Sequence, residues 1–270
     1  MKRSYRSDSH VHSSHSPDAY DPMLQMCEAA EQAGLYSITM TDHCECDTYT
    51  IDNYNHSARQ SYAEAREIAQ ALQGRIHVYA GIELGQPLQN RKAAEDILSA
   101  CDFDFVLGSL HGLAGEKDFY FLDYTSVDVH KVLGRYFDEL LSMVQWNGFD
   151  SLAHITYPFR YIVGEHGIPA DPMEYSEQID AIFSLLIQNK KALELNTSGL
   201  RQKIGQTLPP FALLQRFRQL GGTYVTIGSD AHRCGDVAAG LDAGFSLLQQ
   251  AGFTEFTIYT GREPRLIPIP

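Results

Sequence analysis

The sequence predicts a parallel (β/α) barrel with a metal site where the strands end. Seven short apolar runs, rich in β-branched or aromatic residues, alternate with helical patterns, as in folds built on a parallel sheet. No linker, repeat or change in composition divides the chain. Residues 1–270 are therefore expected to form a single domain, with a barrel that is either closed or incomplete.

The strands read as near-continuous apolar runs, which is the pattern of parallel strands buried on both faces. They are expected over residues 6–10, 37–41, 76–81, 104–109, 150–154, 192–196 and 223–228. A last run, 256–259, is predicted to be either an eighth strand or an accessory piece.

Helical patterns are expected between these strands, over residues 21–34, 54–72, 127–146, 173–188 and 210–220. Pro22 suits the first turn of a helix and Gly34 suits its end. Gly148 likewise ends the third pattern, whose apolar residues recur at helical spacing. The stretch 155–172 carries three prolines, and its length predicts a functional loop above the barrel mouth.

Composition narrows the class of protein. With 44% apolar and 20% charged residues, the chain resembles an ordinary globular protein. Its net charge of −13 argues against nucleic-acid binding, and no apolar run is long enough to span a membrane.

Residues 1–8 leave no room for a signal peptide, so a cytoplasmic protein is expected. The five cysteines have no zinc-finger spacing and are expected to be reduced.

Histidines and acids gather where the apolar runs stop. His10 and His12 end the first run at a spacing that points both side chains to one face of a strand. Asp230 and His232 repeat this spacing at the end of the seventh run. A parallel barrel collects its strand ends at one mouth, and imidazole and carboxylate are ligands that divalent metals share. The sequence therefore predicts a multinuclear metal site.

Three further strand ends each contribute one group. Glu83 follows an apolar run in which a carboxylate would be costly to bury without a metal or hydrogen bonds. A carboxylate can also bridge two metals. His111 and His154 each end a strand and would each supply one nitrogen.

The order of these motifs resembles the PHP (polymerase and histidinol phosphatase) superfamily of metal-dependent phosphoesterases over nearly the whole chain. The motifs are the HxH of His10 and His12, the TDH of Asp42-His43, the isolated Glu83, the single His111 and His154, and the SDAH that ends in His232. Residues 195–201 and 228–233 look most like those of the stand-alone histidinol-phosphate phosphatases. The resemblance implies a distorted (β/α)7 TIM-like barrel with the metal site at the C-terminal ends of the strands.

The resemblance also implies three divalent metal ions, which this ligand chemistry allows to be manganese, iron or zinc. Their implied ligands are His10, His12, Asp18, His43, Glu83, His111, His154, Asp230 and His232. Glu83 would bridge the first two metals. Asp18 stands where many relatives have histidine, and His15 is the competing ligand for the third metal. If His15 is free, it is expected to face the substrate.

The resemblance implies a phosphoric monoester hydrolase, a histidinol-phosphatase of histidine biosynthesis. In this chemistry a metal-bridging hydroxide is expected to attack the small phosphorylated substrate. Arg160 and Arg201 each follow a strand end, and the planar guanidinium suits phosphate. Two alternatives stay open: a PHP phosphoesterase acting on another small phosphomonoester or a nucleotide, and a metal-binding PHP domain without catalysis. The sequence leaves the oligomeric state open.

Overall fold

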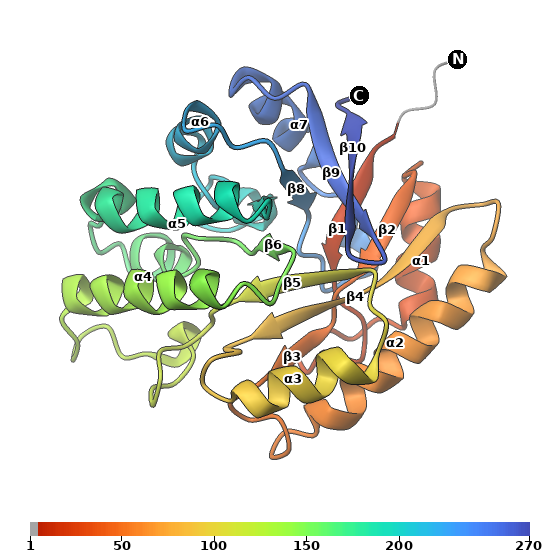
Figure 1. The fold of residues 1–270 in the computed structure, drawn as a ribbon, viewed down its shortest axis with the longest axis horizontal. Helices are drawn as coiled ribbons and strands as arrows, with labels where there is room; N and C mark the ends of the chain where they lie inside the picture. The colour runs from red at the N-terminus through yellow and green to blue at the C-terminus, as the bar shows by residue number, and fades with distance from the viewer. Residues whose placement is uncertain (1–4) are drawn as a thin grey trace.

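A barrel of parallel strands forms the centre of the computed structural model, which describes residues 5–270. Residues 1–4 lie outside the described residues. The prediction that residues 1–8 leave no room for a signal peptide therefore falls partly outside them. Among the described residues, seven parallel strands pair in the order β1-β2-β4-β5-β6-β7-β8, and the short β3 pairs with β4. Figure 1 shows the helices arranged around this sheet. The predicted barrel class is confirmed.

The strands are short and almost entirely buried, as their apolar sequences predicted. Their bounds are β1 Ser7–Val11, β2 Ser37–Met40, β3 His43–Glu45, β4 His77–Gly85, β5 Phe105–Ser109, β6 Ser151–Leu152, β7 Ala192–Asn196 and β8 Val225–Gly228. β3 was not predicted, β4 extends beyond the predicted end, and β6 is shorter than expected because the chain leaves the sheet before His154. His154 has a φ of 45°, which an extended strand cannot accommodate.

The helices cover the outside of the sheet with their apolar faces inward. They are α1 Met23–Gln32, α2 Tyr54–Ala71, α3 Arg91–Ala100, α4 Val129–Trp146, α5 Ser176–Gln188, α6 Phe211–Gln219 and α7 Leu241–Gln250. α3 and α7 were missed. The side chains of Asn90 and Asp128 cap α3 and α4 by accepting hydrogen bonds from backbone N–H groups. None of the helices within residues 5–270 is long and apolar enough to cross a membrane.

Short helical turns occupy the loops at the barrel mouth. The predicted functional loop 155–172 contains a wide π-helical turn, Arg160–Glu165, and the 3-10 turn Pro172–Tyr175 leads into α5. Similar 3-10 turns are Phe119–Phe121, Ser198–Arg201 and Cys234–Asp236. Each follows a strand end, so the side chains on these turns lie near the mouth.

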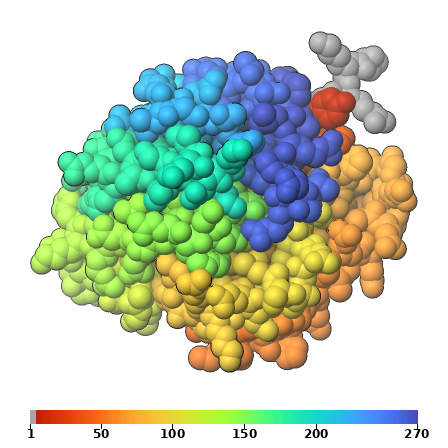
Figure 2. Space-filling model, viewed as in Figure 1, coloured from red at the N-terminus to blue at the C-terminus, as the bar shows by residue number. Residues whose placement is uncertain are grey.

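An antiparallel hairpin, β9 (Glu255–Thr260) and β10 (Glu263–Pro268), closes the other end of the barrel. Residues 256–259 therefore form the predicted accessory piece and are separate from the barrel sheet. Arg262 donates hydrogen bonds to the Asp150 carboxylate, and the Gly261 N–H bonds Asp104. Asp104 and Asp150 precede β5 and β6, so the hairpin covers the amino ends of these strands. Figure 2 shows this carboxy-terminal segment, in dark blue, lying across the face.

The barrel closes where the chain beyond β8 meets β1. The Asp230 N–H donates to the His10 carbonyl over 2.8 Å, and the His12 N–H donates to the Ala231 carbonyl over 2.9 Å. Gly228 permits this approach, because a Cβ at that position would overlap the Cβ of His10. Closure of the barrel and the placement of its first two histidines thus depend on the same backbone contact.

We expect Gly228→Ala to destabilise the metal-free protein by about 1–3 kcal/mol, the usual cost of forcing extra atoms into a packed interior. Thermal or denaturant unfolding measures this. Gly134→Ala is the matched control, since no atom lies within 4 Å of a Cβ there and Gly134 lies in α4. The control should gain about 0.5–1 kcal/mol from helix propensity. Equal stability of the two variants would contradict the close packing at Gly228.

Candidate metal centre

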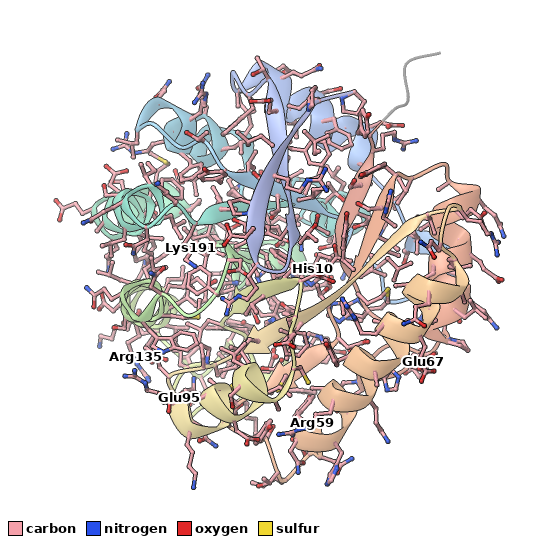
Figure 3. All side chains as sticks on the ribbon, turned by 45° about the vertical axis from the view of Figure 1, so that its right-hand side comes forward. His10, Arg59, Glu67, Glu95, Arg135 and Lys191 are labelled. Carbon is pink, nitrogen blue, oxygen red and sulfur yellow. The ribbon has the colours of Figure 1, made fainter. Side chains whose placement is uncertain are left out.

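The mouth of the barrel brings all nine predicted metal ligands into one connected cluster. Figure 3 shows His10 near the centre of the molecule, whereas Arg59, Glu67, Glu95 and Arg135 lie on the outer helices. His10, His12, Glu83, His111 and His154 are almost completely buried. Three overlapping groups of side chains have nitrogen or oxygen atoms within 4.8 Å of one another. They are His10-His12-Glu83, His43-Glu83-His111 and His12-His43-His232.

The first part of the cluster surrounds the end of β1. The Nε2 atoms of His10 and His12 are 2.9 Å apart. They lie 3.3 and 3.4 Å from Glu83 Oε2, and 3.6 and 3.5 Å from Asp230 Oδ1. Asp230 reaches this position with a φ of 55°, a left-handed conformation that is uncommon for residues other than glycine and recurs at functional sites. Four donor atoms thus converge on one small volume.

The second part of the cluster lies on the other side of the Glu83 carboxylate. Glu83 Oε1 is 3.1 Å from His111 Nε2 and 2.9 Å from His154 Nε2. Its two oxygens therefore face two different groups of histidines, because Oε2 also lies 3.0 Å from His43 Nδ1. This arrangement matches a carboxylate that bridges two metal ions.

The third part is the most exposed. Asp18 lies between two histidines, 3.6 Å from His43 Nε2 and 3.2 Å from His232 Nε2. His15, the alternative to Asp18 in the sequence, points its Nε2 to the Glu64 carboxylate at 2.7 Å. The geometry favours Asp18 over His15 as a ligand, and it gives His15 a protein partner of its own.

Burial and mutual charge set the protonation of the metal-free cluster. Burial lowers the pKa of His12 to about 3 and that of His154 to about 4, so both rings are neutral at pH 7 and have a lone pair to donate. Burial would raise the pKa of Glu83 and of Asp230. The positive charge of His10 and its neighbours outweighs burial and holds the pKa of each well below its usual range.

Other histidines of the cluster hold protons in the metal-free protein. Burial would lower the pKa of His111, but Glu45 and Glu83 raise it to about 10. In the same way, Glu194 and Glu83 outweigh burial and raise the pKa of His10 well above its usual value. Protons thus neutralise acids that would otherwise be buried with uncompensated charge. A divalent cation can supply the same compensation, so the donor set fits a metal ion.

Glu45 is a functional candidate that the sequence reasoning missed. Its Oε1 lies 2.9 Å from His111 Nδ1 and 3.2 Å from His43 Nδ1. Its Oε2 is buried and has no hydrogen-bond partner among the described residues. A Cβ at Gly85 would overlap this carboxylate, so the glycine leaves room for it. The i, i+2 spacing of His43 and Glu45, the same signal used for His10 and His12, could have identified it.

A cavity of about 270 Å³ adjoins the cluster and contains both predicted phosphate-binding arginines. Arg160 Nη2 donates to Ser198 Oγ at 3.2 Å and to Asp230 Oδ2 at 3.4 Å. Arg160 Nε is buried and has no partner in the described part of the chain. Arg201 Nη2 donates to the Asp230 carbonyl at 3.4 Å. The two guanidinium groups therefore lie beside the metal cluster with donor capacity left.

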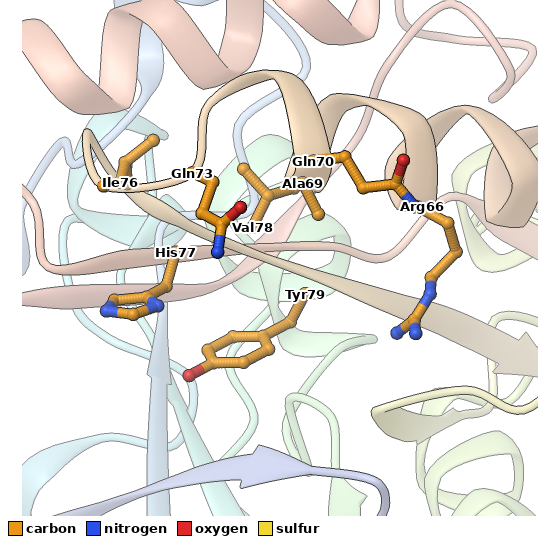
Figure 4. Close-up of a pocket in the computed structure, with 9 residues that line it drawn as sticks. Arg66, Ala69, Gln70, Gln73, Ile76, His77, Val78 and Tyr79 are labelled. Atoms are coloured by element: carbon orange, nitrogen blue, oxygen red, sulfur yellow. The ribbon is translucent and has the colours of Figure 1, made fainter.

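A larger hollow, of about 360 Å³, lies at the amino end of β4. Figure 4 shows its lining, which comes from the end of α2 and the start of β4 and includes Arg66, His77 and Tyr79. No carboxylate or second histidine lines it among the described residues. Despite its size, this hollow lacks the donors of a metal centre.

The comparison with known families agrees with this geometry. Residues 8–198 match the PHP domain family. The chain belongs to the PHP family. A probable histidinol-phosphatase of Clostridium acetobutylicum is 30% identical over 83% of this chain and 86% of its own length. A histidinol-phosphatase of Lactococcus lactis is 26% identical over 94% of both chains.

A solved structure shares the fold. The histidinol phosphate phosphatase of L. lactis, solved with zinc, L-histidinol and phosphate, superposes with a TM-score of 0.81. The superposition covers 97% of this chain and 99% of that one at 23% identity. The PHP chain described here therefore has the barrel of that enzyme, and its histidine and glutamate clusters support binding of divalent metal.

We expect metal affinity to rise with pH between about 5.5 and 8. His10 and His111 have raised pKa values and hold protons across this window, and a metal must displace each proton before the nitrogen can bind it. By linkage, each displaced proton strengthens binding by about tenfold per pH unit. Calorimetric titration in buffers of different ionisation enthalpy measures the protons released. Affinity that does not change with pH would contradict this protonation pattern.

Proposed function

We propose that this PHP protein is a metal-dependent phosphatase that hydrolyses L-histidinol phosphate to L-histidinol and phosphate, a step of histidine biosynthesis. The observation that carries the proposal is the Glu83 carboxylate, whose two oxygens face separate groups of histidines. A cavity with two arginines lies beside this cluster. The likeness to histidinol-phosphatases over most of the chain supports the choice of substrate. The chain is a phosphoric monoester hydrolase.

We propose that the cluster binds three divalent metal ions. Their proposed ligand sets are His10, His12, Glu83 and Asp230 for the first, Glu83, His111 and His154 for the second, and Asp18, His43 and His232 for the third. Mixed nitrogen and oxygen donors suit zinc, iron and manganese. When bound, such metals act as Lewis acids on the phosphoryl oxygens and lower the pKa of water towards neutrality.

The arginines would hold the phosphate on the cavity side of the cluster. Burial acts to lower the pKa of Arg160, but Tyr161 and Asp230 outweigh it and raise the pKa, so the guanidinium stays charged. The Tyr157 ring lies 4.7 Å from this guanidinium and fixes its plane. Arg201, with its side chain 25% exposed, also lines the cavity. Both guanidinium groups would stabilise the negative charge that develops on the phosphate oxygens during phosphoryl transfer.

The phosphoryl group would pass directly to water. The phosphorus–oxygen bond to the histidinol oxygen breaks, water supplies the new oxygen, and the departing alcohol oxygen takes up a proton. Tyr157 and the ligands His111 and His154 pack ring against ring. This packing excludes water from one side of the reacting group, where charge interactions are then stronger.

The first test compares phosphate release from L-histidinol phosphate, nucleoside monophosphates, phosphotyrosine and an aryl phosphate. We expect the highest kcat/KM for L-histidinol phosphate, its loss on chelation, and recovery when a divalent metal is added. Preference for another ester would refute the substrate but keep the phosphatase chemistry. Metal binding without hydrolysis of any of these esters would contradict the proposed activity.

The second test concerns the arginines. Arg160→Ala and Arg201→Ala should each lower kcat/KM by about 10²–10³-fold, since each removes one preorganised donor from developing negative charge. Metal content should stay at the wild-type value. Arg135→Ala is the control, because Arg135 lies on α4 and pairs with Glu116 and Glu139 at the surface. Wild-type kinetics in both cavity variants would exclude their role in phosphate binding.

A further inference from the structure

Glu194 is a buried carboxylate that none of the proposed metal ligand sets uses. It lies on β7 with 1% of its surface exposed. Its Oε1 is 2.6 Å from His10 Nδ1, the ring nitrogen that faces away from the cluster. An ionised carboxylate in such a place is costly unless its oxygens are paired. The short contact with His10 supplies one partner.

Asn196 supplies the partner for the second oxygen. Its Nδ2 donates to Glu194 Oε2 at 3.3 Å and to Asp230 Oδ2 at 3.2 Å. The orientation of the amide is fixed, because its Oδ1 accepts from the Ser198 N–H at 3.0 Å. The i, i+2 spacing on β7 points Glu194 and Asn196 to the same face of the strand. Side chains of β7 therefore contact both His10 and Asp230.

The backbone of β8 encloses this arrangement. A Cβ at Gly228 would lie 3.0 Å from Glu194 Oε1 and would overlap the His10 side chain. Gly228 thus packs directly against the pair. Glu194, His10 and Gly228 come from β7, β1 and β8, the strands at the point where the barrel closes. A side chain at position 228 would therefore displace His10 or Glu194.

The contact fixes which nitrogen of His10 carries the proton. A carboxylate only accepts hydrogen bonds, so Nδ1 is the nitrogen that keeps its proton when His10 gives one up to bind a metal. Nε2 is then left with its lone pair directed at Glu83 and Asp230. Carboxylates that hold a ligand histidine in this way set its tautomer and raise its basicity, and their loss typically costs 10–100-fold in metal affinity or activity.

We propose that Glu194, held by Asn196, is a positioning residue that fixes the tautomer and orientation of His10 for metal binding. The inference rests on the proposed function, in which His10 is a ligand of the first metal. Glu194 itself touches neither metal nor substrate.

The experiment measures metal affinity by competition with a chromogenic chelator, together with the melting temperature of the metal-free and metal-loaded protein. Glu194→Ala should weaken the binding of one metal ion by about 10–100-fold and reduce the gain in melting temperature on loading. Glu194→Gln can still accept the Nδ1 proton through its amide oxygen, so it should recover much of the affinity.

Asp104→Asn is the matched control. Asp104 is also a buried carboxylate, but it accepts hydrogen bonds from the Ala80 and Gly261 N–H groups beneath the hairpin, at the other end of the barrel. This variant should lower stability with and without metal and leave metal affinity unchanged. Equal losses of metal affinity in Glu194→Ala and Asp104→Asn would reveal general destabilisation and overturn the inference.

His10→Ala separates the inference from the function on which it rests. If His10→Ala keeps every metal, the proposed ligand set is wrong. If His10→Ala loses a metal while Glu194→Ala and Glu194→Gln both bind with wild-type affinity, the ligand set stands and the positioning role of Glu194 is refuted. The ¹⁵N–¹H signal of His10 Nδ1 in the zinc-loaded protein gives a second readout. It should persist in Glu194→Gln and be lost to solvent exchange in Glu194→Ala.

Discussion

A single carboxylate, that of Glu83, is surrounded by five imidazoles contributed by different parts of the barrel. Its Oε2 lies within 3.4 Å of His10, His12 and His43, and its Oε1 within 3.1 Å of His111 and His154. These histidines come from β1, from the start of β3 and from the loops after the strands, so the cluster forms only when the barrel is assembled. In return, the buried acid needs these groups, or the metal they bind, to offset the cost of removing its charge from water.

A second layer of acids holds the imidazoles that surround Glu83. Glu194 contacts the outer nitrogen of His10, and Glu45 contacts the outer nitrogen of His111. Glu45 also lies 3.2 Å from His43 Nδ1, the nitrogen that faces Glu83. A hydroxyl takes the place of the acid at His12, whose Nδ1 lies 3.1 Å from Ser16 Oγ. These partners make the cluster rigid before any metal arrives. Rigid placement matters for catalysis, because donors aimed in advance need no reorganisation as charge develops on the phosphoryl group.

The sequence was most informative about the groups at the strand ends. The i, i+2 spacing of His10 with His12, and the single Glu83 after an apolar run, required only the geometry of a strand and the cost of burying charge. The order of the motifs along the chain then identified the family. The same spacing occurs in His43 and Glu45, and in Glu194 and Asn196. It did not predict the roles of Glu45 and Glu194, because neither pair contains two histidines.

Other features depend on distant contacts that no local pattern records. The left-handed backbone at His154 and Asp230 is imposed by their neighbours in the folded barrel. β6 is short for the same reason. The role of 256–259 as part of a hairpin depends on Asp104 and Asp150, which lie more than a hundred residues earlier. The helices α3 and α7 have only 10 residues each, a length at which the helical period is hard to recognise in a sequence.

The most direct test of the shared role of Glu83 is a crystal structure of the metal-loaded protein with anomalous scattering data. The account predicts two separate metal peaks, one within about 2.0–2.2 Å of each Glu83 oxygen, with the nearest imidazole nitrogens from His10 and His12 at one metal and from His111 and His154 at the other. A single metal at Glu83, or metals bound without either of its oxygens, would contradict it.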